Sequence, residues 1–356
     1  MQTKQLDFFL GGLSPTGYAG YYSQVLQNKE GTVVLLKAGP GCGKSTLMKR
    51  VAAALTQQGE IIEAIHCSAD PASLDGVICP ARGIAIIDAT APHVVEPTYP
   101  VAFEDVITLY NALQRKRLQS NRAEIIELFN RYKSLQERAT RYITAAGSLL
   151  QDTLRVAGCC TDVPKAMAFA NVLSHHYLPA TGRKWEESIR LLSANTLQGR
   201  LLFDETVSNI ADTIIVVDDP YGAASKVLMA ALRQQGVEKG HRFYTCYCSM
   251  SPFDKIEHLL FPDLRLAFVT SNPYHAFHFA QQRVIHYTRF SNNQLLQMRR
   301  ARLRFNKKAT QELLAQAADA QAEAKQCHDT LEKYYSENFN FDVLEIAFAQ
   351  IMNYFT

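Results

Sequence analysis

The chain has 356 residues, of which 47% are hydrophobic and 20% are charged, as is typical of a globular protein. Its formal net charge of +3 is too small to indicate nucleic-acid binding by itself, and no apolar run reaches the ~18 residues of a membrane span. The eight cysteines include no C-x-x-C pair, and the N-terminus lacks the apolar run of a signal peptide. We therefore expect a cytoplasmic protein with reduced thiols and about two domains.

The first half of the chain shows an α/β pattern. Residues 32–37 (TVVLLK) are typical of a buried parallel strand, and a glycine-rich turn and a helix over about 44–55 follow it. Further strands are expected at 61–66 and 84–88. The polar, helix-rich segment from about 103 to 178 predicts a long helical hairpin that covers or extends from the sheet.

The same order of elements recurs at an offset of 181 residues. Identical residues align over the strand, the turn, the helix and the next strand: Thr32 with Thr213, Gly41 with Gly222, Leu47-Met48 with Leu228-Met229, and Cys67-Ser68 with Cys248-Ser249. We therefore predict an α/β fold of two tandem lobes with mainly parallel sheets, at 1–180 and 181–356. Each lobe is expected to carry its own helical hairpin, over about 103–178 and about 291–356.

The most specific motif is the sequence AGPGCGKST, which follows the first strand and opens the first helix. Glycines let backbone N–H groups surround a phosphate, and the helix start adds free N–H donors and a positive dipole end. This is a Walker A loop with alanine at its first position. The residues expected to bind the nucleotide are Gly39, Pro40, Gly41, Cys42, Gly43, Lys44, Ser45 and Thr46.

Lys44 is expected to contact the β- and γ-phosphates and Ser45 to bind Mg²⁺. Asp88 ends a neighbouring strand, where a carboxylate can hold Mg²⁺ through water, although a strand-ending Asp also caps turns. At the offset of 181, three acids of the first half lose their carboxylates: Asp70 aligns with Ser251, Asp75 with Ile256 and Asp88 with Val269.

These losses make Asp70 and Asp75 candidate catalytic residues beside Lys44 and Asp88, with drift at exposed loop acids as the alternative. His93 and Glu96 are weaker candidates, because a lone His after a Pro is more often structural.

The second copy of the loop has lost the features that bind phosphate. Lys37-Ala38 becomes Asp218-Asp219, and Gly43-Lys44-Ser45 becomes Ala224-Ser225-Lys226. Two carboxylates at this point would repel a triphosphate. We expect the nucleotide to bind only in the first lobe, with the second lobe kept for packing or regulation.

Four segments, FFLGGLSPTG (8–17), GPGCGKST (39–46), HCSADPASLDG (66–76) and DATAPHVVEP (88–97), carry a resemblance to a known family. Together they resemble an uncharacterised bacterial family of tandem-repeat P-loop NTPases, described by analogy as ATPases or nucleotide kinases. The resemblance covers the whole chain and implies ATP and Mg²⁺ binding at Lys44, Ser45 and Asp88. It implies no substrate.

Three functions follow from this pattern. The favoured one is ATP hydrolysis coupled to motion or to an unknown protein partner; the alternatives are a phosphotransferase acting on a nucleotide or small molecule, and a nucleotide sensor with negligible turnover. Basic clusters at 115–122 and 299–308 predict either a paired surface for nucleic acid or anionic lipid, or two solvated helix faces. The Ala/Gln-rich segment 311–324 is interpreted as a hairpin arm or a homo-oligomer contact.

Overall fold

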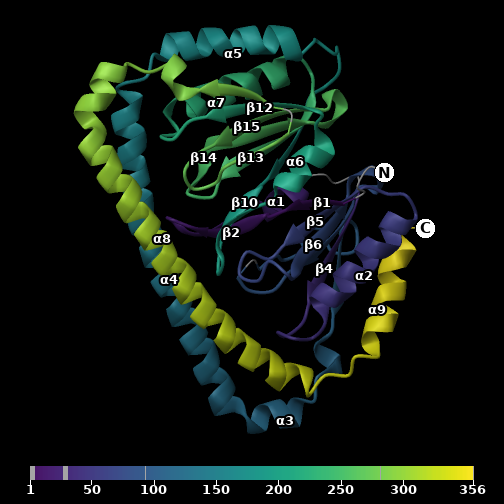
Figure 1. The fold of residues 1–356 in the computed structure, drawn as a ribbon. Coiled ribbons are helices and arrows are strands. Elements are labelled where there is room, and N and C mark those ends of the chain that lie inside the picture. Colours follow the sequence, from purple (N-terminus) through teal and green to yellow (C-terminus); the bar gives the residue numbers. More distant parts are fainter. Residues whose placement is uncertain (1–4, 27–30, 93, 281, 356) are drawn as a thin grey trace.

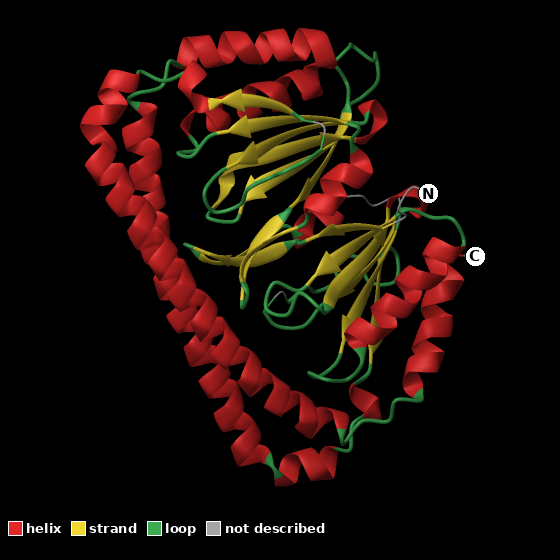
Figure 2. Ribbon diagram, viewed as in Figure 1, coloured by secondary structure: helices red, strands yellow, loops and turns green. Residues whose placement is uncertain are grey.

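The protein is described from a computed structural model, which covers residues 5–26, 31–92, 94–280 and 282–355. Two six-stranded sheets define two lobes (Figures 1 and 2). In lobe 1 the strand order is β1 (Gln5–Phe8), β5 (Ile62–His66), β6 (Leu74–Cys79), β7 (Ile84–Asp88), β4 (Thr32–Lys37) and β8 (Glu104–Thr108). In lobe 2 it is β9 (Glu186–Arg190), β13 (Arg242–Cys248), β14 (Ser251–Phe261), β15 (Leu266–Ser271), β12 (Thr213–Asp218) and β16 (Arg283–His286).

The two sheets have the same topology. Among the described strands of each sheet, three of the five pairings are parallel. The third strand in the order, which is β6 in lobe 1 and β14 in lobe 2, runs antiparallel to both of its neighbours. The predicted α/β fold with two mainly parallel lobes is therefore confirmed. Strand β4, which lies between β7 and β8, has four consecutive buried residues, as expected for a parallel strand covered on both faces.

Strand registers correct the alignment of the two repeats. Thr32 pairs with Ile84, whereas Thr213 pairs with Leu266, so the offset has grown from 181 to 182 residues by this point of the chain. The counterpart of Asp88 is therefore Thr270. By the same register, in which Glu63 faces Ile78 and Tyr244 faces Leu260, the counterpart of Asp75 is Glu257. The alignment of Asp75 with Ile256 and of Asp88 with Val269 was wrong by one residue.

The long helix of each repeat packs against the long helix of the other repeat, so the expectation of a hairpin within each lobe was wrong. Helix α4 (Arg122–Gly158) packs along α8 (Asn293–Ser336), and the two long helices, here called the arms, run antiparallel beside both lobes (Figure 1). Hydrogen bonds and ion pairs along their length join Glu124 to Tyr334, Arg138 to Glu323 and Asp152 to Arg302. The hairpin is therefore formed between the repeats and not inside them.

The helices that follow the arms also change lobes. Helix α5 (Val163–Tyr177) packs on α7 (Ala223–Glu238) of lobe 2, and α9 (Val343–Met352) packs on α2 (Lys44–Gln57) of lobe 1. A bidentate ion pair between Arg50 and Glu345, at 2.7 and 2.8 Å, joins α2 to α9. Each lobe is thus completed by a helix from the other repeat, and a division at 1–180 and 181–356 separates neither lobe cleanly.

The remaining elements are short. They include the hairpins β2 (Gly11–Ser14) with β3 (Gly17–Gly20) and β10 (Ser193–Thr196) with β11 (Gly199–Leu202), and the helices α1 (Tyr22–Val25), α3 (Arg115–Ser120) and α6 (Asp204–Ile210). Single 3₁₀ turns occur at Pro80–Arg82, Tyr110–Ala112, Pro262–Leu264, Tyr287–Arg289 and Asn353–Phe355. None of the helices in the described ranges combines the length and the apolar character needed to cross a bilayer.

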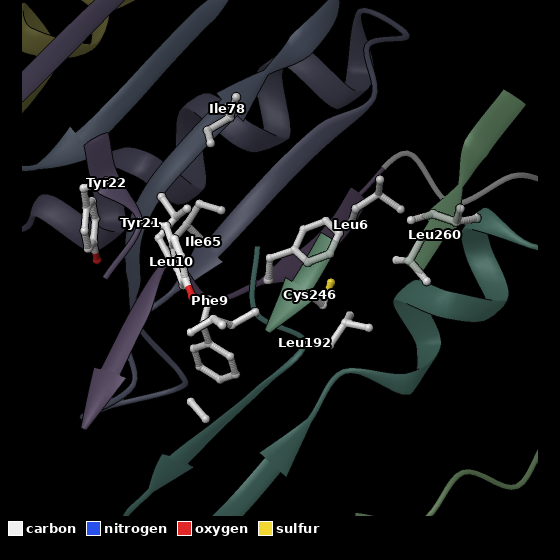
Figure 3. Packing of buried hydrophobic residues seen from close by; sticks show 14 of the residues in the cluster. Leu6, Phe9, Leu10, Tyr21, Tyr22, Ile65, Ile78, Leu192, Cys246 and Leu260 are labelled. Atoms are coloured by element: carbon white, nitrogen blue, oxygen red, sulfur yellow. The ribbon is translucent and has the colours of Figure 1, made fainter. Parts of the chain in front are cut away.

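One hydrophobic cluster is shared by the two lobes. Figure 3 shows Leu6 and Phe9 of the first repeat beside Leu192 and Leu260 of the second. Backbone hydrogen bonds of 2.8 Å in both directions join Phe9 to Leu191. Burial of this apolar surface favours one fixed arrangement of the lobes.

A buried ion pair crosses the same interface. Arg190 of β9 donates to Glu63 of β5 at 2.6 Å, and the Tyr244 hydroxyl donates to the other oxygen of Glu63 at 2.8 Å. Both charged side chains are buried, so each depends on the other for its hydrogen bonds.

Candidate functional site

The glycine-rich loop connects the carboxyl end of β4 to the first turn of α2. Gly41 and Gly43 have φ values of 67° and 77°, and Gly43 is the N-cap of α2. This left-handed conformation is unfavourable for residues with a Cβ. The backbone of the loop therefore requires glycine at positions 41 and 43.

The amides of the loop are not used in the hydrogen bonds that the described residues form. Within the described ranges, no backbone or side-chain oxygen accepts a hydrogen bond from the amides of residues 41–46. These amides lie at the start of α2, where the helix dipole also favours negative charge. The loop, here called the cradle, therefore presents free amides at a helix start, and anion binding there stays a prediction.

Lys44 and Asp88 lie together at this cradle. The Lys44 Nζ donates to the carbonyls of Ala38 and Gly39 at 3.2 and 3.0 Å, and it lies 3.6 Å from Asp88 Oδ2. Both side chains are largely buried, with 12% and 11% exposed. Asp88 ends β7, directly beside β4, and its other oxygen accepts from the amide and hydroxyl of Thr90. The Lys44 ammonium group is therefore held by two backbone carbonyls and lies beside one carboxylate of the chain itself.

The remaining acids predicted from sequence lie on the β6 side of the loop. Ser45 Oγ accepts from the Leu74 amide at 3.0 Å, which fixes the hydroxyl at the start of β6. Asp75 follows and is buried, so it is no exposed loop acid. Asp70 accepts from Ser73 at 3.0 Å and faces Lys325 of α8 at 3.6 Å. The structure thus brings both acids to the same side of the cradle as Ser45.

Two tyrosines join Asp75 in this buried wall. The Tyr22 hydroxyl donates to Asp75 at 3.5 Å, and the Tyr18 hydroxyl donates to Tyr22 at 3.4 Å. Burial, with the neighbouring charge of Tyr18 and Asp75, raises the pKa of Tyr22 well above its usual value. Tyr22 is therefore a neutral hydrogen-bond donor to the Asp75 carboxylate.

The arms contribute residues that the sequence did not identify. Lys325 reaches Asp70, and His328 Nδ1 lies 3.5 Å from Glu332 one turn later on α8. Burial lowers the pKa of His328 although the charge of Glu332 opposes this shift, and the positive charges of Lys325 and Lys44 act in the same direction as burial. His328, Asp329 and Glu332 form one of two groups in the described ranges whose atoms are close enough to share a metal ion. These residues follow the loop by about 280 positions in the chain, which left no sequence signal for this placement.

The outer face of the loop packs closely against α8 and α9. A Cβ at Gly39 would lie 2.5 Å from the Tyr335 ring, and one at Gly41 would lie 2.7 Å from the Glu332 carbonyl. A Cβ at Gly43 would lie 2.6 Å from Leu344 of α9. A change in the shape of this loop must therefore be felt by the C-terminal helices.

In lobe 2 the corresponding cradle is filled by a carboxylate of the protein itself. Asp219 is fully buried and accepts hydrogen bonds from the amides of Tyr221, Gly222 and Ser225 at 3.1, 2.9 and 2.8 Å. The connection from β12 to α7 is 219–222, two residues shorter than 38–43 in lobe 1. Asp218 points elsewhere and pairs with His286 at 2.9 Å. The second loop therefore binds its own side chain where lobe 1 has free amides.

A buried group of charges lies below the second loop. Glu257 accepts from Arg200 at 2.9 Å and from Lys255 at 3.2 Å. Burial alone would raise the pKa of Glu257, but the nearby His275, Arg200 and Lys255 hold it well below its usual range. At the offset of 181, Asp75 aligns with Ile256 instead of Glu257, so the aligned sequences give no sign of this group.

Two further predictions have different outcomes. His93 lies outside the described residues, and Glu96 forms an exposed ion pair with Lys37 at 2.5 Å. The basic clusters do not form one paired surface, because α3 lies at one end of the arms and residues 299–308 lie at the other (Figure 1). Arg302 of the second cluster pairs with Asp152, so part of that cluster holds the arms together.

No protein-family model, curated protein or solved structure matches this chain.

Proposed function

We propose that lobe 1 binds a Mg²⁺–nucleoside triphosphate, with ATP as the expected nucleotide, and that the protein is an ATPase. The observation that carries this proposal is the anion cradle with free amides at residues 41–46, closed by the Lys44 ammonium group. A lysine on such a loop can follow the negative charge that moves toward the leaving oxygen during phosphoryl transfer.

Ser45 and Asp88 fit a magnesium ion, because hydroxyl and carboxylate oxygens are the hard ligands that this ion prefers. When bound, Mg²⁺ would neutralise charge on the phosphates. Lys44 would hold the β- and γ-phosphate oxygens, and the amides of residues 41–46 would surround the β-phosphate. We assign Asp75 and Asp70 to the orientation of the attacking water, with Tyr22 fixing the carboxylate of Asp75.

A single nucleotide per chain is supported by the contrast between the loops. In lobe 2 the Asp219 carboxylate already takes three amide hydrogen bonds, and no lysine opens the helix. A phosphate there would have to displace a buried negative charge. We propose that lobe 2 serves packing and regulation.

Hydrolysis coupled to motion is favoured because the arms reach the cradle. Lys325 pairs with Asp70, and Glu332 and Tyr335 lie against the loop glycines. Nucleotide-dependent changes at the loop could therefore pass to α8 and on to lobe 2 or a protein partner. The eight cysteines, all within the described ranges, are free, which supports our proposal of a cytoplasmic location.

The test is a turnover assay with Mg-ATP, alone and with a panel of nucleotides and small metabolites. Phosphate release without an acceptor, lost in Asp88→Asn and retained in the lobe 2 control Asp254→Asn, supports the ATPase. ADP formation only with an acceptor would identify a phosphotransferase, and tight binding without turnover would identify a sensor. Absence of any nucleotide binding would overturn the proposal.

A further inference from the structure

A cavity of about 60 Å³ lies in lobe 2, between the second loop and arm helix α4. By the usual measure a buried water needs only roughly 10–15 Å³, so the space is large enough for a small polyatomic group. The residues that give it its chemistry are Arg200, Tyr221, Gly222, Lys255, Glu257 and Tyr274. Glu257 is the counterpart of Asp75, so the cavity lies where lobe 1 has its candidate catalytic wall.

Strand register also places a new cation in this cavity. The turn from Ser14 to Gly17 in lobe 1 matches the turn from Thr196 to Gly199 in lobe 2, so Arg200 stands where lobe 1 has Tyr18. A neutral hydroxyl at one position has become a guanidinium group at the other. The two lobes therefore present different chemistry at the same place in the fold.

The hydrogen bonds of Arg200 leave one strong donor unused. Its side chain is 6% exposed, and its Nη2 donates to Glu257 at 2.9 Å and to Ser193 at 3.3 Å. In the described part of the chain, its buried Nε–H has no acceptor. A buried guanidinium donor without an acceptor is costly, and an oxygen in the cavity would satisfy it.

Lys255 supplies the second positive charge. Its Nζ donates to the other oxygen of Glu257 at 3.2 Å, and its side chain is 9% exposed. It lies against the second loop, because a Cβ at Gly222 would be 3.1 Å from the Lys255 Nζ. The cavity lining therefore carries two cations against the one carboxylate of Glu257, while the Asp219 carboxylate is bound to its three amides.

A metal ion does not fit this place, although Glu257, His258 and His275 are close enough to share one. The Nδ1 of His258 accepts from the Thr270 amide at 3.2 Å, so the proton of the neutral ring is on Nε2, the atom nearest Glu257. Arg200 and Lys255 also bond the same carboxylate and would repel a cation. The charge of the lining favours an anion.

We propose that this lobe 2 cavity is an oxyanion site, in which a phosphate or carboxylate group of a small molecule binds between Arg200 and Lys255. The guanidinium and ammonium groups supply the charge and the donors, and Glu257 fixes both cations from behind. The site does not use the glycine loop of lobe 1, so it stands or falls independently of nucleotide binding there.

The experiment uses the full chain with Lys44→Ala, so that the cradle of lobe 1 does not contribute. Inorganic phosphate and acetate are titrated separately by calorimetry at constant ionic strength. We expect saturable binding of at least one of them at one site per chain. Phosphate binding without acetate binding assigns a phosphate group, and the converse assigns a carboxylate.

Two variants and a control decide whether binding is at the cavity. Lys255→Met leaves the Arg200–Glu257 pair intact, and the double variant Arg200→Met/Glu257→Gln removes that pair while leaving an amide oxygen as the acceptor for Lys255. Each should weaken binding at least tenfold. Lys226→Met, which removes an exposed lobe 2 cation paired with Asp254, should leave affinity unchanged. Absence of saturable binding, or equal affinity in the parent and both cavity variants, would overturn the proposal.

Discussion

Replacing Asp219 should show that the second loop is stabilised by its own carboxylate. The side chain is fully buried and accepts three amide hydrogen bonds of 2.8–3.1 Å at the start of α7. Although the N-cap of α7 is Gly222, Asp219 accepts from helix-start amides as an N-cap side chain does. Losing such a side chain costs about 0.5–2 kcal/mol, and leaving further buried amides unsatisfied costs about 1–3 kcal/mol. We therefore expect Asp219→Ala to lower the free energy of unfolding by about 3 kcal/mol, and Asp219→Asn, which keeps one acceptor oxygen, by about half as much.

The assay is urea unfolding followed by the fluorescence of Trp185, the single tryptophan of the chain, which lies in the second repeat just before β9. Asp218→Ala is the matched control, because this neighbouring acid forms only a half-exposed pair with His286 and should cost less than about 1 kcal/mol. If Asp219→Ala were no more destabilising than Asp218→Ala, the carboxylate would not be filling the cradle in the way described.

Three further predictions concern other parts of the molecule. Burial lowers the pKa of His275 to about 4, below its ordinary value of about 6.5, so the unfolded chain binds the extra proton and stability should fall as the pH drops from 6.5 toward 4, by up to about 1.4 kcal/mol per pH unit. Urea unfolding across this range should give a shallower slope for His275→Gln, and an identical slope would contradict the assignment. Glu63→Ala should cost about 3–5 kcal/mol because it leaves Arg190 buried and unpaired, whereas Glu63→Gln/Arg190→Met should cost much less; equal losses in a denaturant titration would count against a buried pair. Gly43→Ala should destabilise the protein by about 1–2 kcal/mol, because the φ of Gly43 is 77° and the new Cβ would meet Leu344. Gly158→Ala, with open space around it, should be neutral or stabilising. The reverse order of melting temperatures would refute the loop geometry.

The sequence was sufficient for the parts of the fold that depend on local pattern. The apolar run at 32–37 forms the inner strand β4, and the glycine loop with Lys44 opens α2 directly after it. The repeat was also visible, since both sheets have the same strand order. These features follow from periodicity and turn chemistry, which act over a few residues.

The errors arose where partners are distant in the chain. An amphipathic helix such as α4 can bury its apolar stripe against a helix of either repeat, so its pairing with α8 had no local signal. For the same reason, Lys325 and His328 could not be connected with the loop. A one-residue insertion between Tyr247 and Ile256 moved the aligned residue from Glu257 to Ile256, which turned a retained acid into an apparent loss.

Asp219 shows a different limit. The sequence placed a carboxylate at the second loop and predicted repulsion of phosphate, but the same charge can instead bind the loop amides. The outcome depends on the loop being two residues shorter, which brings the Asp219 side chain under the N-terminus of α7. Sequence comparison alone did not reveal that geometry.

The most direct measurement of the central claim is the stoichiometry of Mg-ATP binding by calorimetry. We predict one nucleotide per chain, loss of measurable binding in Lys44→Ala, and unchanged affinity in Lys226→Ala, which removes the lysine in the first turn of α7. Two nucleotides per chain, or native affinity in Lys44→Ala, would contradict a single working phosphate cradle in lobe 1.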